Sequence, residues 1–398
     1  MLFSTHCLLF IAFLIPLFPV YAVANDALAR ARTAFDTLQT WYNATNGLWN
    51  TRQWWNSASC MTTIAKMAAI DPLVVDTAVY VFNNTFNRAP SSNPHPGPEV
   101  KTGFPQNHTS SRANDSGNAS QWLDSAYDDD GWWALAWIAA YDVTEDSAYL
   151  ELAEGIFSSL TAAWGTSCGS GGLPWNPTST YVNAITNELF LSIAAHLANR
   201  VPSRQEEYVD WAQKEWDWFA SQGFMGENNT ISDGLLDNCK NNGQTMCACR
   251  PTDLFVFSSL SLSRWSYNQG VVLGGLVELN KAAPNVKLLE FANMIAKAAI
   301  GTLSDSNMII HELCEPNDCA PDATQFKGIF IRNLQMLQEA SPHHIYKQVI
   351  DSCAKSIWAN DRNSQNQLGV NWAGPFMDPA DVSTHSSAMD ALLAAITG

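Results

Sequence analysis

The stretch ITNELFLSIAAHLA, residues 185–198, shows the pattern that decides the fold of this 398-residue chain. Leu189, Ile193 and Leu197 recur every four residues, as on one face of an α-helix. Small or apolar residues fill most of the other positions. A helix that is apolar on nearly all sides is buried, so this pattern predicts a helix enclosed by other helices.

Helical patterns of 13–22 residues recur along the whole chain, whereas extended runs rich in β-branched residues are scarce. We expect twelve helices, over residues 26–46, 55–69, 72–86, 128–142, 146–162, 180–199, 203–223, 264–282, 286–301, 323–340, 343–358 and 383–397. Twelve helices without an obvious short repeat suggest paired inner and outer helices. The predicted fold is therefore all-α, an (α/α)6 barrel made of six helical hairpins.

The inner helices of such a barrel should be the most apolar and the richest in small residues. Residues 134–140, 185–198 and 271–279 fit that description. No linker interrupts the helical pattern, so residues 23–398 are predicted to form a single catalytic domain.

The N-terminal segment MLFSTHCLLFIAFLIPLFPVYA, residues 1–22, contains no Asp, Glu, Lys or Arg and ends in small side chains. It predicts a cleaved signal peptide, although the usual basic residues are missing. A membrane anchor is the alternative, but Pro16 and Pro19 interrupt the run, and no second stretch approaches the roughly 20 apolar residues that span a bilayer. We expect a secreted protein, extracellular or in a cell wall, without a stable membrane anchor.

Sequons and cysteines agree with a secretory route. Four of six Asn-x-Ser/Thr sequons fall between residues 83 and 120, which predicts an exposed, glycosylated surface. The six are Asn43, Asn83, Asn107, Asn114, Asn118 and Asn228. Eight cysteines follow the signal segment, and an even count predicts up to four disulfides of unknown pairing. They are Cys60, Cys168, Cys239, Cys247, Cys249, Cys314, Cys319 and Cys353.

The composition excludes some classes of ligand. A net charge of −17 argues against binding to nucleic acid or an anionic membrane, which requires basic patches. Cys247 and Cys249 are close together, but no histidine or second close pair completes a zinc set, so no metal is expected. The run GSGG at 169–172 is a turn rather than a nucleotide site, and no cofactor is expected. Sixteen tryptophans point instead to a carbohydrate, because indole faces stack on sugar rings.

Three adjacent carboxylates open the segment YDDDGWWALAW, residues 127–137. One aspartate at the start of a helix is explained by capping, because free N–H groups and the helix dipole favour negative charge there. Three in a row before two tryptophans suggest chemistry. Glycosidases use two carboxyl groups, and retaining enzymes hold them about 5–5.5 Å apart. The helix N-terminus lowers the pKa of one carboxyl, while repulsion and apolar walls raise that of the other.

The chain resembles glycoside hydrolase family 76, the α-1,6-mannanases, in particular its fungal secreted members. The resemblance spans nearly all of the mature chain and rests on the order and spacing of several segments, not on one. They are WWNSASCMTTIAKMAAID (54–71), YDDDGWWALAWIAAYDVT (127–144), CGSGGLPWNP (168–177), YVNAITNELFLSIAAHLA (181–198), WSYNQGVVLGGLVEL (265–279), FKGIFIRNLQ (326–335) and NWAGPF (371–376).

The resemblance implies an (α/α)6 barrel and a retaining mechanism carried by an adjacent aspartate pair. Aligned on Tyr-Asp-Asp-x-x-Trp-Trp, that pair is Asp128 as nucleophile and Asp129 as acid/base. The alternative pair, Asp129 and Asp130, would lose the preceding tyrosine and the second tryptophan of the pattern. In the preferred register Asp130 is a cap or a supporting group.

The same resemblance implies substrate-binding positions at the starts of other inner helices and in a C-terminal loop. They are Trp54, Trp55, Asn56, Trp132, Asn268, Gln269, Phe326, Lys327 and Trp372. The alternative for each is structural, because Asn at a helix start caps and Trp packs.

The expected protein is an endo-acting retaining enzyme that cleaves α-1,6-mannosidic bonds in mannan backbones and acts as a monomer. One rival is a cell-wall mannan transglycosidase. Such relatives carry a C-terminal tail for lipid anchoring, whereas residues 391–398 close an amphipathic helix, which favours a free hydrolase. The other rival is a non-catalytic mannan-binding protein, which would not need two adjacent carboxylates.

Overall fold

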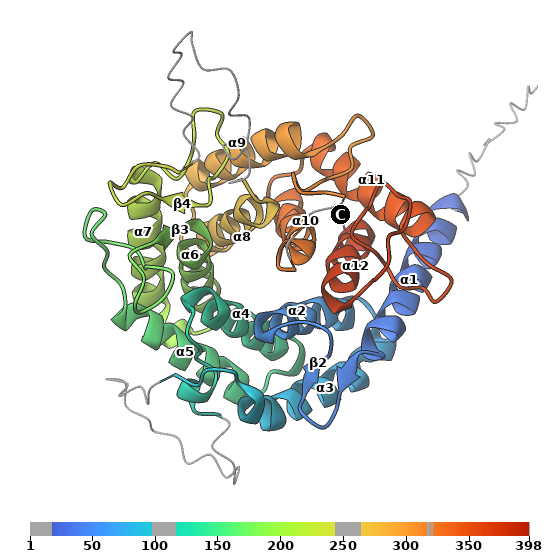
Figure 1. The fold of residues 1–398 in the computed structure, drawn as a ribbon, viewed down its shortest axis with the longest axis horizontal. Coiled ribbons are helices and arrows are strands. Elements are labelled where there is room, and N and C mark those ends of the chain that lie inside the picture. Colours follow the sequence, from blue (N-terminus) through green and yellow to red (C-terminus); the bar gives the residue numbers. More distant parts are fainter. Residues whose placement is uncertain (1–17, 98–116, 243–263, 317–318, 320, 398) are drawn as a thin grey trace, which may run out of the picture.

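The computed structural model describes residues 18–97, 117–242, 264–316, 319 and 321–397. In these ranges twelve α-helices form two concentric rings (Figure 1). The inner ring consists of α2 (Trp54–Ile70), α4 (Tyr127–Thr144), α6 (Ala184–Ala198), α8 (Ser266–Ala282), α10 (Ala323–Ala340) and α12 (Val382–Thr397). The outer ring consists of α1 (Phe18–Gln39), α3 (Val75–Arg88), α5 (Ser147–Ala162), α7 (Gln205–Ser221), α9 (Val286–Leu303) and α11 (His344–Asn360). The predicted (α/α)6 barrel is confirmed.

The inner ring is closed, because each inner helix packs on the next and α12 packs on α2. Residues at the starts of neighbouring inner helices contact one another, as Trp55 contacts Trp132, Tyr267 contacts Phe326 and Thr324 contacts Ser383. The inner helices therefore begin at the same end of the barrel. We call this end the mouth. Its loops carry two short antiparallel pairs, β1 (Tyr42–Asn43) with β2 (Leu48–Trp49), and β3 (Val182–Asn183) with β4 (Gly234–Leu235). Short 3-10 turns precede α3, α4 and α7, at Pro72–Val74, Ala119–Gln121 and Pro202–Arg204, and Ala89–Ser92 follows α3.

The inner helices are buried on almost all sides, as their composition predicts. Every residue of α6 except His196 is buried. Glycines allow the closest approaches: a Cβ at Gly270 would lie 2.6 Å from the Cα of Phe330, and one at Gly328 would lie 2.5 Å from the Cα of Ser387. Small residues therefore set the spacing of α8, α10 and α12.

The helix boundaries agree closely with the sequence pattern. The predicted helix 323–340 is α10 without a shift, and most others move by one to four residues. The exception is α1, which runs over Phe18–Gln39 instead of 26–46. Its C-terminal part is replaced by the β1–β2 hairpin, where Gly47 adopts a positive φ of 72° that a helix cannot contain.

The disulfide prediction is only partly correct. Cys168 pairs with Cys239, and Cys314 pairs with Cys319. Cys60 and Cys353 are free thiols buried in the core, so the described residues contain two of the up to four disulfides that the cysteine count allowed. Cys247 and Cys249 lie outside the described residues. Within the described residues, no helix is long and apolar enough to cross a membrane.

Candidate active site

The aspartate run lies in the first turn of α4, at the mouth. Ala126 is the N-cap and supplies no side-chain cap, so the free N–H groups of this turn are left to the aspartates. Oδ1 of Asp128 accepts a hydrogen bond from the backbone N–H of Asp129 at 3.1 Å. The side chains of Asp128 and Asp129 are half-buried, whereas Asp130 is only 2% exposed. Two of the three carboxylates are therefore accessible from the mouth.

Asp130 has a supporting position. Its Oδ1 accepts the backbone N–H of Asp124 at 2.7 Å, and Oδ1 of Asp124 accepts the N–H of Ala126 at 2.6 Å. These bonds fix the turn that leads into α4. This is the capping or supporting role that the sequence allowed for one of the three aspartates.

The environments of Asp128 and Asp129 separate their proton affinities. Burial raises the pKa of Asp128 to about 7, but N–H groups of its own turn and the Trp175 side chain donate to it and stabilise its charged form. Burial raises the pKa of Asp129 well above its usual range, and the nearby charges of Asp128 and Asp124 raise it further. Asp128 therefore has donors that favour its charged form, whereas burial and the charges around Asp129 favour its protonated form.

A second group of polar side chains lies near Asp128, on α6 and on the segments that lead into β3 and β4. Nδ2 of Asn183 lies 3.5 Å from Oδ2 of Asp128. Tyr181 donates its hydroxyl hydrogen to Asp233, and burial raises the pKa of Asp233. Glu188 is fully buried, and neither of its oxygens has a hydrogen-bond partner among the described residues. Burial, and then the charge of Asp233, raises the pKa of Glu188 well above its usual range.

Tyr267 connects these groups. Burial raises the pKa of its hydroxyl, and the charges of Asp233, Asp128 and Glu188 raise it further, so this hydroxyl is electrostatically coupled to all three carboxyls. Tyr267, Asp233 and Glu188 were not among the predicted site positions. A signal was present in the quoted segment YVNAITNELF, where Glu188 is a carboxylate among apolar positions of an inner helix.

Aromatic rings from four inner helices lie side by side next to the carboxylates. Trp55 stacks on Trp132 with ring centroids 5.8 Å apart. The ring centroid of Phe326 lies 6.5 Å from that of Trp55. Phe326 in turn stacks on Tyr267 at 3.7 Å. Nε1 of Trp55 donates to Asp322 at 3.2 Å. The structure thus brings together three of the predicted positions, Trp55, Trp132 and Phe326.

Trp54 lies elsewhere. It packs against Trp122 at 5.7 Å and Trp133 at 4.7 Å, and all three indoles are buried in the layer between the inner and outer helices. This is a packing position, and Trp54 is not part of the aromatic row that contains Trp55.

The predicted polar residues of α8 differ in their surroundings. Asn268 is fully buried and contacts Asp233, whose pKa it lowers. Gln269 is engaged by the backbone: its Oε1 accepts the N–H of Ile231 at 2.8 Å, and its Nε2 donates to the carbonyls of Ile231 at 2.8 Å and Trp265 at 3.1 Å. Gln269 therefore fixes the loop that carries Asp233.

Lys327 and Trp372 form one buried unit. Nζ of Lys327 donates to the carbonyl of Val370 at 2.7 Å, pairs with Oε1 of Glu315 at 2.5 Å, and lies 4.4 Å from the centroid of the Trp372 ring. Both side chains are fully buried. They hold the loop before α12 against α10.

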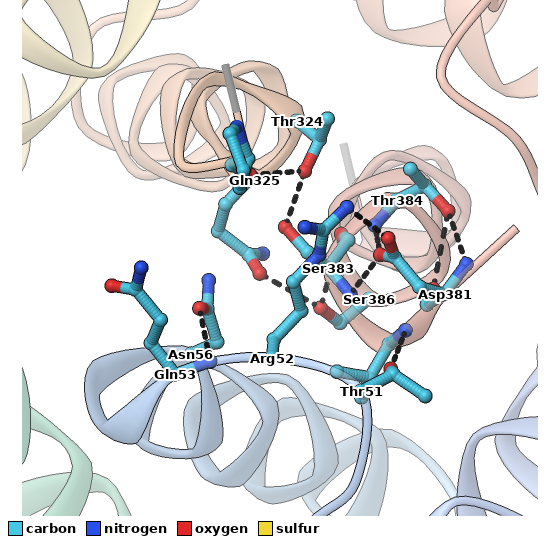
Figure 2. A network of polar contacts seen from close by, with 12 residues as sticks. Thr51, Arg52, Gln53, Asn56, Thr324, Gln325, Asp381, Ser383, Thr384 and Ser386 are labelled. Carbon is cyan, nitrogen blue, oxygen red and sulfur yellow. Dashed lines mark hydrogen bonds and ion pairs between the residues drawn. The ribbon is translucent and has the colours of Figure 1, made fainter. Parts of the chain in front are cut away.

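Figure 2 shows the polar contacts where α2, α10 and α12 meet. Arg52 forms an ion pair with Asp381, whose Oδ1 accepts the N–H groups of Ser383 at 2.9 Å and Thr384 at 3.0 Å. Thr324 and Ser383 share a hydrogen bond of 2.7 Å between their hydroxyls. We call Arg52, Thr324, Asp381, Ser383 and Thr384 the closing network, because it joins the first inner helix to the last two.

Two further contacts extend the closing network. The hydroxyl of Ser386 donates to Oε1 of Gln325 at 3.1 Å. Asn56, a predicted substrate-binding residue, lies on α2 beside the closing network. Its Oδ1 accepts the N–H of Gln53 at 3.2 Å. Nδ2 of Asn56 has no hydrogen-bond partner among the described residues, and the side chain is 1% exposed.

Comparison with known proteins agrees with this geometry. The sequence model of glycosyl hydrolase family 76 matches residues 21–397, which is nearly the whole chain. The chain belongs to glycosyl hydrolase family 76.

Similar family members include a putative mannan endo-1,6-alpha-mannosidase of Schizosaccharomyces pombe, 31% identical over 248 residues, with 58% of this chain and 52% of the relative covered. The mannan endo-1,6-alpha-mannosidase DCW1 of Candida albicans is 28% identical over 272 residues, covering 62% of this chain and 55% of the relative. The chain thus spans about half the length of these relatives.

Solved structures of family 76 share the barrel. The GH76A alpha-1,6-mannanase from Salegentibacter sp. HEL1_6 superposes with a TM-score of 0.69 at 19% identity, covering 93% of this chain and 99% of the other. Dfg5 from Chaetomium thermophilum, in complex with glucosamine, has a TM-score of 0.69 at 19% identity, covering 94% and 90%. These likenesses establish the fold.

Proposed function

We propose that this family 76 protein is an endo-acting retaining glycosidase that cleaves α-1,6-mannosidic bonds in mannan backbones. The observation that carries the proposal is the adjacent pair Asp128 and Asp129, accessible at the mouth, with proton affinities separated by their surroundings. A retaining glycosidase needs one ionised and one protonated carboxyl beside the scissile bond.

In the proposed mechanism the ionised Asp128 attacks the anomeric carbon of the mannosyl unit. Asp129 gives its proton to the departing O6 of the next unit, and a covalent glycosyl-enzyme remains. Asp129, now ionised, removes a proton from water as that water attacks the same carbon and releases Asp128. Asn183 is close enough to orient the Oδ2 of Asp128 between the two steps.

Relatives support the substrate and the pair. One solved structure is described as an inactive variant of the Salegentibacter alpha-1,6-mannanase, with two consecutive aspartates changed to asparagine, in complex with alpha-1,6-mannotriose. In this chain, the row of Trp55, Trp132 and Phe326 supplies apolar faces of the kind on which sugar rings stack. Asn56, Asn268, Gln269, Lys327, Trp54 and Trp372 stay predictions as substrate ligands.

Product analysis tests the proposal. The wild type is expected to release short oligosaccharides from linear α-1,6-mannan, and NMR of the first product should show the α anomer. The variants Asp128→Asn and Asp129→Asn should lose this activity. Full activity in both variants would place the chemistry elsewhere, and an inverted first product would exclude the covalent intermediate.

Transglycosylation is the second candidate, favoured by the likeness to Dfg5 with bound glucosamine. It uses the same intermediate, with a sugar hydroxyl in place of water. Incubation with mannan and a labelled acceptor sugar separates the two: transfer to the acceptor in preference to water would assign the chain as a transglycosidase.

We also propose that the chain is secreted after removal of residues 1–22, and that the remaining domain is a monomer. N-terminal sequencing and light scattering of the protein from culture medium test both points. A mature N-terminus far from residue 23, or a stable dimer, would contradict them.

A further inference from the structure

A hollow on the outer wall of the barrel carries exposed aromatic surface beside a sequon. It has a volume of about 330 Å3. Its lining residues come from α3, the end of α4 and the start of α5: Val79, Tyr80, Asn83, Thr144, Asp146 and Tyr149. Tyr80 is 54% exposed and Val79 is 39% exposed, unusually high values for such side chains in this protein. Asn83 begins the sequon Asn83-Asn84-Thr85.

The amide nitrogen of Asn83 is available. The residue is exposed on α3, and its Oδ1 accepts a hydrogen bond from Nδ2 of Asn87 at 3.1 Å. Its own Nδ2, the atom that N-glycosylation modifies, has no hydrogen-bond partner in the part of the chain that the structure describes. A group attached there begins at the edge of the hollow.

Other sequons differ in their surroundings. Asn43 is half-buried in the β1–β2 hairpin, where Nδ2 donates to Oδ1 of Asn50 at 3.5 Å. Asn118 is half-buried and caps a 3-10 turn through its Oδ1. Asn228 is exposed like Asn83 and serves as the matched comparison. Asn107 and Asn114 lie outside the described residues.

The timing of modification follows from Thr85. This residue is fully buried, and its Oγ1 donates to the carbonyl of Gly47 at 2.7 Å. Recognition of a sequon requires its hydroxyl side chain, so the sugar must be attached before this part of the chain folds. The folded structure then decides what the attached sugar contacts.

We propose that Asn83 carries an N-linked glycan whose first sugar lies in this hollow and covers Tyr80 and Val79. In the transfer, Nδ2 loses a proton and bonds to the anomeric carbon of an N-acetylglucosamine, while the bond from that carbon to a lipid-linked diphosphate breaks and the diphosphate leaves. The apolar face of the sugar stacks on the exposed phenol ring. Because α3 belongs to the outer ring, the glycan leaves the mouth open.

Glycopeptide mass spectrometry of the full chain, secreted from a yeast host, tests occupancy at Asn83. Asn83→Gln should remove one glycan and lower Tm by roughly 1–3 °C, a shift expected for a modest loss of contact in a domain of this size. Asn228→Gln removes the other exposed sequon and should leave Tm within about 1 °C. Mannan-degrading activity should be unchanged in both variants.

The contact itself is tested by two more measurements. Trimming to a single N-acetylglucosamine with an endoglycosidase should preserve the Tm, since the first sugar makes the contact. Tyr80→Ser should lower Tm in the glycosylated protein and not in the Asn83→Gln background. An unoccupied Asn83 overturns the proposal, and so does a Tyr80→Ser effect that is the same with and without the glycan.

Discussion

Two sets of polar side chains lie at the mouth of this barrel, and they are built in opposite ways. In the closing network, Arg52 and Asp381 pair, and the hydroxyls of Thr324 and Ser383 bond to each other. On the acidic side, formed by Asp128, Asp129, Glu188 and Asp233, burial raises the pKa of every carboxyl. An ion pair and its hydrogen bonds fix geometry, whereas carboxyls with raised pKa values keep protons available for transfer.

The largest expected effect separates the two members of the proposed pair. Asp128→Asn should reduce kcat by roughly 10³–10⁶-fold on any substrate, because it removes the nucleophile. Asp129→Asn should cost roughly 10²–10⁴-fold on mannan, and much less on an aryl α-mannoside whose leaving group needs no proton. Initial rates on both substrates measure this difference.

Asp130→Asn is the matched control for that measurement. It keeps the size of the side chain and lies next in sequence, but its carboxylate supports the Asp124 turn. Asp130→Asn should lower the free energy of unfolding, and it should leave the ratio of the rates on mannan and on the aryl α-mannoside nearly unchanged. If Asp130→Asn instead reproduces the selective loss on mannan, the acid/base has been assigned to the wrong aspartate.

A change in the closing network should affect folding and not chemistry. Arg52→Ala leaves Asp381 without its ion-pair partner at a mostly buried site, which should cost about 1–3 kcal/mol in the free energy of unfolding. Denaturant titration measures it, and kcat of the folded fraction should stay within about two-fold, a change worth less than 1 kcal/mol. Arg30→Ala breaks the exposed pair with Asp26 and should cost at most about 0.5 kcal/mol.

On the acidic side, the free energy of unfolding should depend on pH. The folded-state pKa of Asp128 is raised to about 7 from 3.8, so the folded protein binds the proton more tightly than the unfolded chain. This stabilising contribution is complete below about pH 3.8 and is lost as pH rises towards 7. Asp128→Asn should therefore be more stable than wild type at pH 7.5, with the difference closing by pH 4. The full shift corresponds to about 4 kcal/mol, and solvent screening of this half-buried side chain reduces the expected difference to about 2 kcal/mol. A gap independent of pH would contradict the raised pKa.

The fold was predictable because it rests on periodic burial. The spacing in residues 185–198 predicts a buried helix, and α6 occupies Ala184–Ala198. The position of the three aspartates in the first turn of α4 was also predictable, because Asp is favoured at helix starts, whereas the catalytic role of Asp128 and Asp129 stays a prediction. The position of Asp233 could not be predicted, because it lies in a loop fixed by Gln269, and no local pattern reveals which loop reaches the site. Lys327 and Trp372 were predicted as ligands, but their contact with each other depends on a loop that is distant in sequence.

A small effect is also expected at Glu188, although a buried carboxylate would be expected to contribute strongly to stability. Burial and the charge of Asp233 raise the pKa of Glu188 well above its usual range, which favours the neutral form in the folded protein. Glu188→Gln keeps its shape and removes only the ability to ionise, so the free energy of unfolding at pH 6 should change by less than about 1 kcal/mol. Glu188→Leu, which also removes the polar atoms, is the comparison. If Glu188→Gln costs several kcal/mol, Glu188 is ionised and has a hydrogen-bond donor. The acidic side would then be held by paired charges, as the closing network is.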